Sequence, residues 1–320
     1  VKKEVWDLTA KLPRVTNPVR QIVRRIEESL KGFITPGLFF ENLGYRYLGP
    51  IDGHRLDELI PVLERVKRMH GPILIHVLTQ KGRGYAPAEN DPVKNMHDLS
   101  ELKQGSYTAA FSDAIVDEAR RRPELVAITA AMPDSTGLLP FGEEFPDRLI
   151  DVGIAEQHAV TAAAGMAMGG LRPVFAVYST FLTRAIDQVN LDVGLHGQPV
   201  VFCLDRAGIT GDDGASHHGV LDMVLLSKVP GMTVFAPSSY QELQQMLHDA
   251  LDITHGPVAI RYPKTPAPSV GEDEVGRGVA ARKTRTGSDV CILAVGKMLA
   301  AAQQAADRLV EEGISCSVWD

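Results

Sequence analysis

Residues 149–158, Leu-Ile-Asp-Val-Gly-Ile-Ala-Glu-Gln-His, decide how the rest of the chain is interpreted. The apolar run 149–152 predicts a buried strand, Gly153 a hinge, and the residues after it a helix with Glu156 in its first turn. The positive end of a helix dipole stabilises a carboxylate there, and ligands of open α/β sheets bind beyond the carboxyl ends of the strands. Glu156 is therefore a candidate to bond a cofactor, although a helix-start glutamate without a functional role has the same pattern.

The helix predicted after Glu156 is rich in small residues, which let another backbone approach closely. These residues are Ala159, Ala162, Ala163, Ala164, Gly165, Ala167, Gly169 and Gly170. We expect either a neighbouring domain or a second subunit against them, and a second subunit would make the protein a homodimer.

Near-continuous apolar runs alternate with segments of helical spacing along the chain, which is typical of parallel strands covered on both faces. The strands are expected at 72–79, 125–130, 149–152, 173–177, 199–204, 258–261, 290–294 and 315–318, and helices at 56–69 and 109–121. The pattern predicts an α/β fold. Four successive strands run into polar or glycine-rich loops, so one rim of one sheet should collect the reactive side chains. Residues 47–54 are expected to form turns.

The composition excludes several classes of protein. A net charge of −7 provides no basic stripe for a nucleic-acid partner. No apolar run reaches the roughly 18 residues of a membrane span. The three cysteines, Cys203, Cys291 and Cys316, fit neither a disulfide framework nor a zinc site.

The ends of the sequence suggest part of a longer chain. Val1 is not a start methionine, no targeting segment precedes the first polar stretch, and residues 318–320 lie inside a predicted strand. We expect a cytoplasmic protein, with a plastid origin left open by the absent N-terminus.

The stretch 154–159, Ile-Ala-Glu-Gln-His-Ala, resembles the pyrimidine-domain signature of thiamine diphosphate enzymes of the transketolase class. Three further stretches agree with it: Gly-Pro-Ile-Asp-Gly-His at 49–54, Lys-Gly-Arg-Gly-Tyr at 81–85 with Pro-Ala-Glu at 87–89, and Asp-Arg-Ala-Gly at 205–208 with Asp-Gly at 213–214. Together they resemble the 1-deoxy-D-xylulose-5-phosphate synthase family over about residues 30–320. The later half alone is also similar to the β subunit of 2-oxo acid dehydrogenases, and the first two stretches favour the synthase.

The resemblance implies tandem doubly wound parallel-sheet domains of the transketolase type. Residues 1–100 would be the C-terminal part of the diphosphate-binding domain, 104–270 the pyrimidine-binding domain, and 285–320 the start of a truncated transketolase C-terminal-like domain. The family's Gly-Asp-Gly motif and downstream Asn, which hold Mg²⁺ and the diphosphate, have no counterpart here. No metal ligand is assigned, and we expect the Mg²⁺ ligands on an absent N-terminal segment.

The implied activity is a transferase dependent on thiamine diphosphate and Mg²⁺. It would join pyruvate with D-glyceraldehyde 3-phosphate to give 1-deoxy-D-xylulose 5-phosphate and CO₂, the first step of the non-mevalonate isoprenoid route, with a product that also feeds thiamine biosynthesis. Two alternatives stay open. One is the β subunit of a 2-oxo acid dehydrogenase E1, which needs an α partner, and the other is a non-catalytic fragment.

The resemblance also assigns roles to individual residues. Glu156 would act on N1′ of the aminopyrimidine, and His97 and His217 would move protons. The other cofactor-binding residues would be Tyr85, Ile154, Phe181, Met132 and Lys81. The substrate-binding residues would be His54, Tyr178, Arg184, Arg206, Asp213 and Lys264. Lys264 stands where Arg is common in the family, and a lysine offers a point charge instead of a bidentate fork to phosphate.

Overall fold

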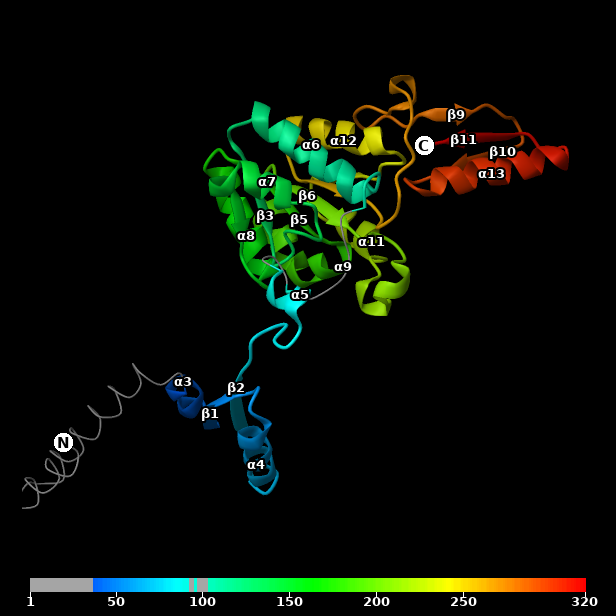
Figure 1. The fold of residues 1–320 in the computed structure, drawn as a ribbon. Helices are drawn as coiled ribbons and strands as arrows, with labels where there is room; N and C mark the ends of the chain where they lie inside the picture. The colour runs from blue at the N-terminus through cyan, green and yellow to red at the C-terminus, as the bar shows by residue number, and fades with distance from the viewer. Residues whose placement is uncertain (1–36, 92–94, 97–102) are drawn as a thin grey trace, which may run out of the picture. The chain divides into compact units, whose positions relative to one another are not determined.

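The computed structural model describes residues 37–91, 95–96 and 103–320, with the side chain of Asp212 left out (Figure 1). The chain divides into two compact units, one within residues 1–99 and one within residues 100–320.

The first unit contains a two-stranded parallel sheet with short helices around it. Its elements are α3 (Leu38–Asn42), β1 (Arg46–Asp52), α4 (Leu56–Val66), β2 (Ile73–Leu78) and α5 (Ala86–Glu89). The turn predicted at 47–54 is wrong, because most of it is strand β1. The register shifts between Leu48 and Ile51, so the strand accommodates Gly49 and Pro50 at an irregularity of the ladder, where a proline is tolerated.

The second unit is built on a six-stranded sheet in which every neighbouring pair of strands is parallel. The strands are β3 (Leu125–Thr129), β4 (Leu149–Asp151), β5 (Arg172–Tyr178), β6 (Val201–Asp205), β7 (Thr233–Phe235) and β8 (Val258–Arg261). Their order is β4-β3-β5-β6-β8-β7. The predicted α/β class with a parallel sheet is therefore confirmed.

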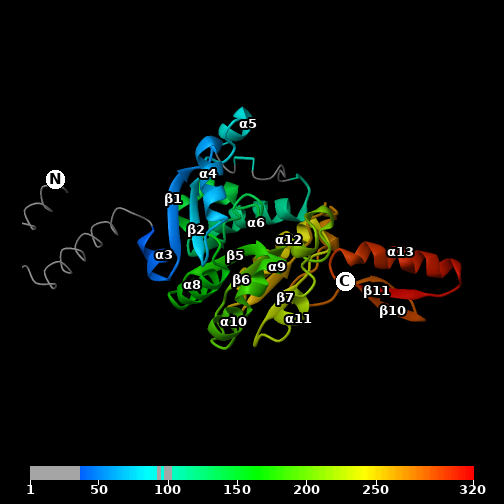
Figure 2. The same ribbon diagram turned by 90° about the horizontal axis from the view of Figure 1, so that it is seen from below.

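Helices cover both faces of this sheet (Figures 1 and 2), as a doubly wound fold requires. On one face α6 (Tyr107–Arg121), α7 (Leu139–Glu144) and α12 (Tyr240–Asp252) share one buried apolar cluster with the strands. On the other face a second cluster includes α8 (Glu156–Met168). Because the strands are buried from both sides, β5 and β6 are buried along their whole length.

The remaining elements of the second unit complete the rim and the C-terminal segment. The loop predicted after β5 is instead helix α9 (Ser179–Leu182), followed by α10 (Ile186–Gln188) and a π-helix at Val189–Gly194. A short helix, α11 (Asp222–Leu226), precedes β7. The C-terminal segment holds β9 (Lys283–Arg285), β10 (Val290–Leu293), α13 (Met298–Glu311) and β11 (Cys316–Trp319). Its sheet has the order β10-β11-β9, with β10 parallel and β9 antiparallel to β11.

The small residues of α8 divide between two environments. Ala159, Ala163 and Ala164 are buried in the core of their own unit, so for these three residues the close neighbour is the sheet that the helix covers. Gly165 is exposed and would meet no atom within 4 Å if it carried a Cβ. The homodimer expected from this helix stays a prediction.

Candidate functional site

The rim at the carboxyl ends of the strands carries the candidate residues of the second unit. Met132 follows β3, Glu156 follows β4, Tyr178 ends β5, Arg206 follows β6 and Lys264 follows β8. These five strands are consecutive neighbours in the sheet order. Parallel strands end at the same edge, so the sequence correctly places these residues on one rim.

The turn from β4 into α8 is held by Asp151. Its Oδ1 accepts hydrogen bonds from the backbone N–H of Gly153 (2.9 Å) and of Ala131 (2.8 Å), which lies in the loop after β3. Gly153 has φ +70°, a conformation that glycine adopts without a Cβ clash. This turn fixes where α8 begins, with Glu156 as its first residue.

Glu156 is buried, with 2% of its surface exposed. Its Oε1 accepts a hydrogen bond from Nη1 of Arg184 at 2.8 Å, and the Arg184 side chain is half exposed. A buried carboxylate at a helix N-terminus is stabilised by the backbone dipole and by this cation. The site therefore presents an anchored acceptor for a donor group of a ligand.

An aromatic cluster lies next to this ion pair. The Phe181 and Tyr178 rings are stacked with centroids 5.5 Å apart, and the His217 ring meets Phe181 at 5.3 Å and Tyr178 at 6.1 Å, both edge-on. The guanidinium of Arg184 lies 5.2 Å from the Phe181 centroid. The structure thus joins Glu156, Arg184, Phe181, Tyr178 and His217, which the sequence spreads over 62 positions, into one cluster.

Arg206 approaches the same cluster from β6. It has φ +58°, a left-handed conformation that few residues other than glycine adopt. Its guanidinium lies 4.2 Å from the Tyr178 ring centroid, and its Nη1 donates to the carbonyl of Ser135 at 2.7 Å. Burial raises the pKa of Tyr178, and the nearby Arg206 charge opposes that rise.

Asp205, the first residue of the 205–208 stretch, was given no role from the sequence, and it is completely buried beneath Arg206. Its Oδ1 accepts from the Arg206 backbone N–H at 2.6 Å, and its Oδ2 lies 2.9 Å from Arg206 Nη1 and accepts from Thr108 Oγ1 at 2.6 Å. Burial raises the pKa of Asp205, while Arg206 and Thr108 stabilise its charged form. The sequence signals for Asp205 were its place in the 205–208 stretch and its position as an acidic residue at a strand end.

Lys264 and Asp213 form an ion pair, with Lys264 Nζ 2.6 Å from Asp213 Oδ1. Both side chains are partly exposed, at 31% and 21%. A partly exposed pair of this kind is held weakly and can exchange partners with an incoming anion.

The residues around Glu156 suit the aminopyrimidine end of thiamine diphosphate. Ile154, two residues before Glu156, is 78% exposed, so its apolar side chain is accessible to a ligand. Phe181 and Met132 are partly buried at the edge of the core. An apolar edge with one buried acceptor matches a flat heteroaromatic ring that has a protonated nitrogen.

The other assigned residues lie in the first unit or outside the description. His54 Nε2 accepts from the backbone N–H of Gln80 at 2.7 Å, so its Nδ1 carries the proton in the neutral ring. Lys81 and Tyr85 are exposed, and Tyr85 precedes α5. His97 lies outside the described residues.

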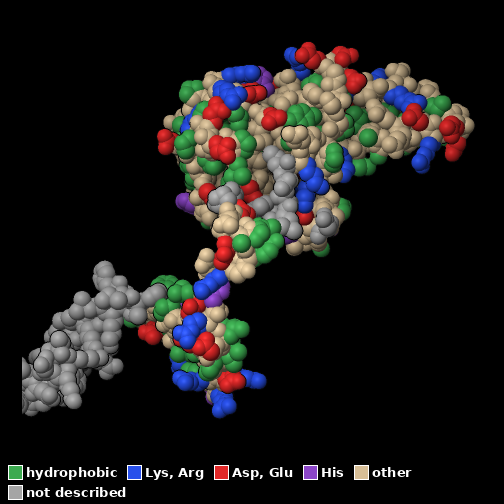
Figure 3. All heavy atoms as spheres, in the orientation of Figure 1, with side chains coloured by type: hydrophobic (Ala, Val, Ile, Leu, Met, Phe, Trp, Pro, Cys, Tyr) green, Lys and Arg blue, Asp and Glu red, His purple; other side chains and the backbone are tan. Residues whose placement is uncertain are grey.

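Within the described residues, no group of three or more His, Cys, Asp or Glu side chains is placed to hold a metal ion. None of the helices in the described ranges combines the length and apolar content that a membrane span requires. Figure 3 shows acidic and basic side chains interspersed over the visible face.

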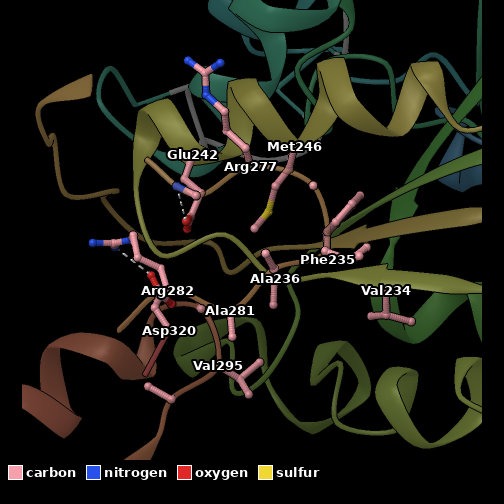
Figure 4. Close-up of a pocket in the computed structure, with 16 residues that line it drawn as sticks. Val234, Phe235, Ala236, Glu242, Met246, Arg277, Ala281, Arg282, Val295 and Asp320 are labelled. Atoms are coloured by element: carbon pink, nitrogen blue, oxygen red, sulfur yellow. Dashed lines mark hydrogen bonds and ion pairs between the residues drawn. The ribbon is translucent and has the colours of Figure 1, made fainter. Parts of the chain in front are cut away.

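A concavity of about 250 Å³ lies between α12, residues 276–282 and the end of β11, away from the cluster around Glu156 (Figure 4). Two buried carboxylates approach one hydroxyl there: Ser238 Oγ is 2.9 Å from Glu242 Oε2 and 2.7 Å from Asp320 Oδ2. Arg282 Nη2 donates to Asp320 at 3.0 Å. Burial raises the pKa of Asp320, with Glu242 adding to that rise and Ser238 and Arg282 opposing it.

Three family models match the chain. Residues 103–269 match the pyrimidine-binding domain of transketolase, residues 1–79 match 1-deoxy-D-xylulose-5-phosphate synthase, and residues 279–320 match the transketolase C-terminal domain. The first match covers more than half of the chain, and the chain therefore belongs to the family of proteins with a transketolase pyrimidine-binding domain.

Within this family the similarity is to 1-deoxy-D-xylulose-5-phosphate synthases. The chain is 46% identical to the synthase of Heliobacterium modesticaldum over 99% of this chain and 51% of that protein. It is 47% identical to a synthase of Geobacter sulfurreducens over 99% of this chain and 52% of that protein. The chain thus spans about half the length of these relatives. The relatives favour the synthase over the dehydrogenase subunit and the non-catalytic fragment.

Solved structures agree on the fold. A split-gene transketolase, described as an inactive β4 tetramer, superimposes with a TM-score of 0.61 at 30% identity, covering 67% of this chain and 70% of that chain. A transketolase of Pichia stipitis superimposes with a TM-score of 0.60 at 18% identity, covering 67% of this chain and 34% of that chain, and this likeness concerns the fold alone.

Proposed function

We propose that the protein forms 1-deoxy-D-xylulose 5-phosphate and CO₂ from pyruvate and D-glyceraldehyde 3-phosphate. The observation that carries the proposal is the buried Glu156 beside an aromatic and cationic rim, in a chain 46% identical to a synthase over 99% of its length. Thiamine diphosphate, when bound, supplies a nucleophilic carbon for the attack on pyruvate.

The cofactor's aminopyrimidine would lie against Ile154 and Phe181, with Met132 at the edge of the same pocket. Glu156 would accept a hydrogen bond from the ring nitrogen, and its burial favours this bond because little water competes for the carboxylate. On the family resemblance, Tyr85 would contact the cofactor and Lys81 would approach its diphosphate. We expect the Mg²⁺ ligands outside the described residues.

His217 and His97 would hold and move protons during the reaction, and the partly exposed His217 ring already touches Phe181 and Tyr178. Glyceraldehyde 3-phosphate would place its phosphate between Arg206 and Lys264. The Arg206 Nε, which is buried, has no hydrogen-bond partner among the described residues, so the guanidinium retains an unsatisfied donor. Tyr178, Arg184, Asp213 and His54 would orient the rest of the substrate.

We further infer the three-domain division 1–100, 104–270 and 285–320, which the family matches at 1–79, 103–269 and 279–320 support. We also propose a homodimer. The exposed Gly165 of α8 supports it, because a second backbone can approach closely where no Cβ is present.

The test is product formation by the protein expressed from its complete gene, given pyruvate, glyceraldehyde 3-phosphate, thiamine diphosphate and Mg²⁺. We expect deoxyxylulose 5-phosphate by mass spectrometry, and none when any one component is omitted. The same preparation should transfer no acetyl group to lipoamide, which a dehydrogenase E1 would do. Acetyl transfer without deoxyxylulose 5-phosphate would reject the proposal in favour of the dehydrogenase.

A further inference from the structure

Asp205 is placed to control the Arg206 guanidinium from inside the protein. Both oxygens of this one carboxylate contact Arg206: Oδ1 at its backbone N–H (2.6 Å) and Oδ2 at its Nη1 (2.9 Å). The Asp205 carboxylate thus holds both the backbone N–H and the guanidinium of Arg206. A side chain held at both ends loses most of its rotamer freedom before any ligand arrives.

This contact also supports an unfavourable backbone. Arg206 has φ +58°, and this left-handed conformation is unfavourable for a residue with a long side chain unless its surroundings hold it. The left-handed turn sends the Arg206 side chain back over the Tyr178 ring, 4.2 Å from its centroid. Without the Asp205 carboxylate, the left-handed backbone of Arg206 would lose the hydrogen bond that stabilises it.

Thr108 fixes the carboxylate in turn. It lies in the first turn of α6, and its Oγ1 donates to Asp205 Oδ2 at 2.6 Å. Thr108 and Asp205 are both buried. A charge-assisted bond without solvent competition restricts the carboxylate rotamer strongly. The chain of contacts therefore runs from α6 through Asp205 to a guanidinium at the rim.

We propose that Asp205 is a positioning residue for recognition of the substrate phosphate, with Thr108 holding its carboxylate. The inference rests on the proposed function in assigning the phosphate to Arg206. The inference predicts that neutralising Asp205 changes the affinity for phosphate in the direction opposite to the one that net charge alone predicts. Neutralising Asp205 removes a negative charge beside the site, which alone would strengthen anion binding. Loss of the held guanidinium should weaken binding instead.

The test compares Asp205→Asn, Thr108→Val and Thr108→Ser in the protein expressed from its complete gene. Glu118→Gln is the matched control, since Glu118 is also a buried carboxylate paired with an arginine, Arg122, at the opposite end of α6. Inorganic phosphate is titrated by calorimetry, after circular dichroism has shown that each variant is folded.

We expect the phosphate dissociation constant to rise about tenfold in Asp205→Asn and about threefold in Thr108→Val, on the scale of a charge-assisted and a weaker hydrogen bond. Thr108→Ser, which keeps the hydroxyl, and the Glu118 control should stay within about twofold of wild type. An unchanged or tighter constant in Asp205→Asn would overturn the inference. If that variant does not fold, the Thr108→Val and Thr108→Ser pair decides alone.

Turnover gives a second, separable readout. In Asp205→Asn the KM for glyceraldehyde 3-phosphate should rise about tenfold, while the KM for pyruvate and the rate with unphosphorylated glyceraldehyde change little. An equal loss with both aldehydes would mean a merely structural role and reject the inference. If Asp205→Asn binds phosphate more weakly than wild type while the wild-type protein forms no product, the inference stands and the proposed function is rejected.

Discussion

Replacing Phe181 by Ala should destabilise the second unit by about 3 kcal/mol, within the range for large-to-small aromatic substitutions. The ring has two aromatic partners, Tyr178 at 5.5 Å and His217 at 5.3 Å, and the Arg184 cation at 5.2 Å. Each aromatic pair contributes about 1 kcal/mol beyond burial, and an exposed cation over a ring about 0.5 kcal/mol. The rest comes from the lost apolar contact with the core cluster.

Phe181→Leu separates the two contributions, because it keeps apolar volume and loses the ring pairs. We expect it to cost most of what Phe181→Ala costs, roughly 2.5 kcal/mol, because both ring pairs and the cation contact are lost. The assay is urea unfolding followed by near-ultraviolet circular dichroism, with the transition of the second unit fitted on its own because a chain of several domains does not unfold in one step. A Phe181→Ala loss below about 0.5 kcal/mol would refute the reasoning, since the ring contacts would then contribute almost nothing.

Three further predictions concern other parts of the second unit. Arg172 is 6% exposed and donates to the carbonyls of Pro199, Ala250 and Ile253. Arg172→Met should lower the free energy of unfolding in urea by about 3 kcal/mol or more, because buried carbonyls lose their donors. Lys264→Arg should lower the KM for glyceraldehyde 3-phosphate about fivefold in steady-state assays, because a fork can bond phosphate bidentately. Burial raises the pKa of Asp320. The attachment of the C-terminal segment should therefore be strongest below about pH 4 and weaken as the pH rises through that raised pKa. Limited proteolysis between pH 4 and 8 should show this weakening in wild type and not in Asp320→Asn.

The regular part of the fold was predictable because its strands are buried on both faces. Runs such as 125–130 and 173–177 are almost entirely apolar, and the structure places β3 and β5 there. Strand β1 was missed because Gly49 and Pro50 are turn residues in most settings, and only pairing with β2 makes 46–52 a strand. Strand β9 was missed because Lys283–Arg285 has no apolar alternation, and its pairing with β11 defines it.

The candidate site was predictable in its position and less so in its contacts. The order of loops after the strands indicated one rim, and the resemblance assigned the residues. No spacing rule links Thr108 to Asp205, 97 positions apart, or Arg184 to Glu156, 28 positions apart. These contacts come from how α6 and the segment after α9 pack on the sheet. The approach of Asp320 to Ser238, 82 positions apart, was unpredictable for the same reason.

The most direct test of the central claim is the turnover of Glu156→Gln compared with wild type, in the protein expressed from its complete gene. Glutamine keeps the size of the side chain and a carbonyl oxygen that can accept the hydrogen bond from Arg184. The Arg184 side chain is half exposed, so the fold should persist. General acid–base roles contribute about 10²- to 10⁴-fold, and we expect kcat for deoxyxylulose 5-phosphate formation to fall within that range while the thermal midpoint changes little. A folded Glu156→Gln protein with wild-type kcat would contradict the account, because Glu156 would then have no part in the chemistry.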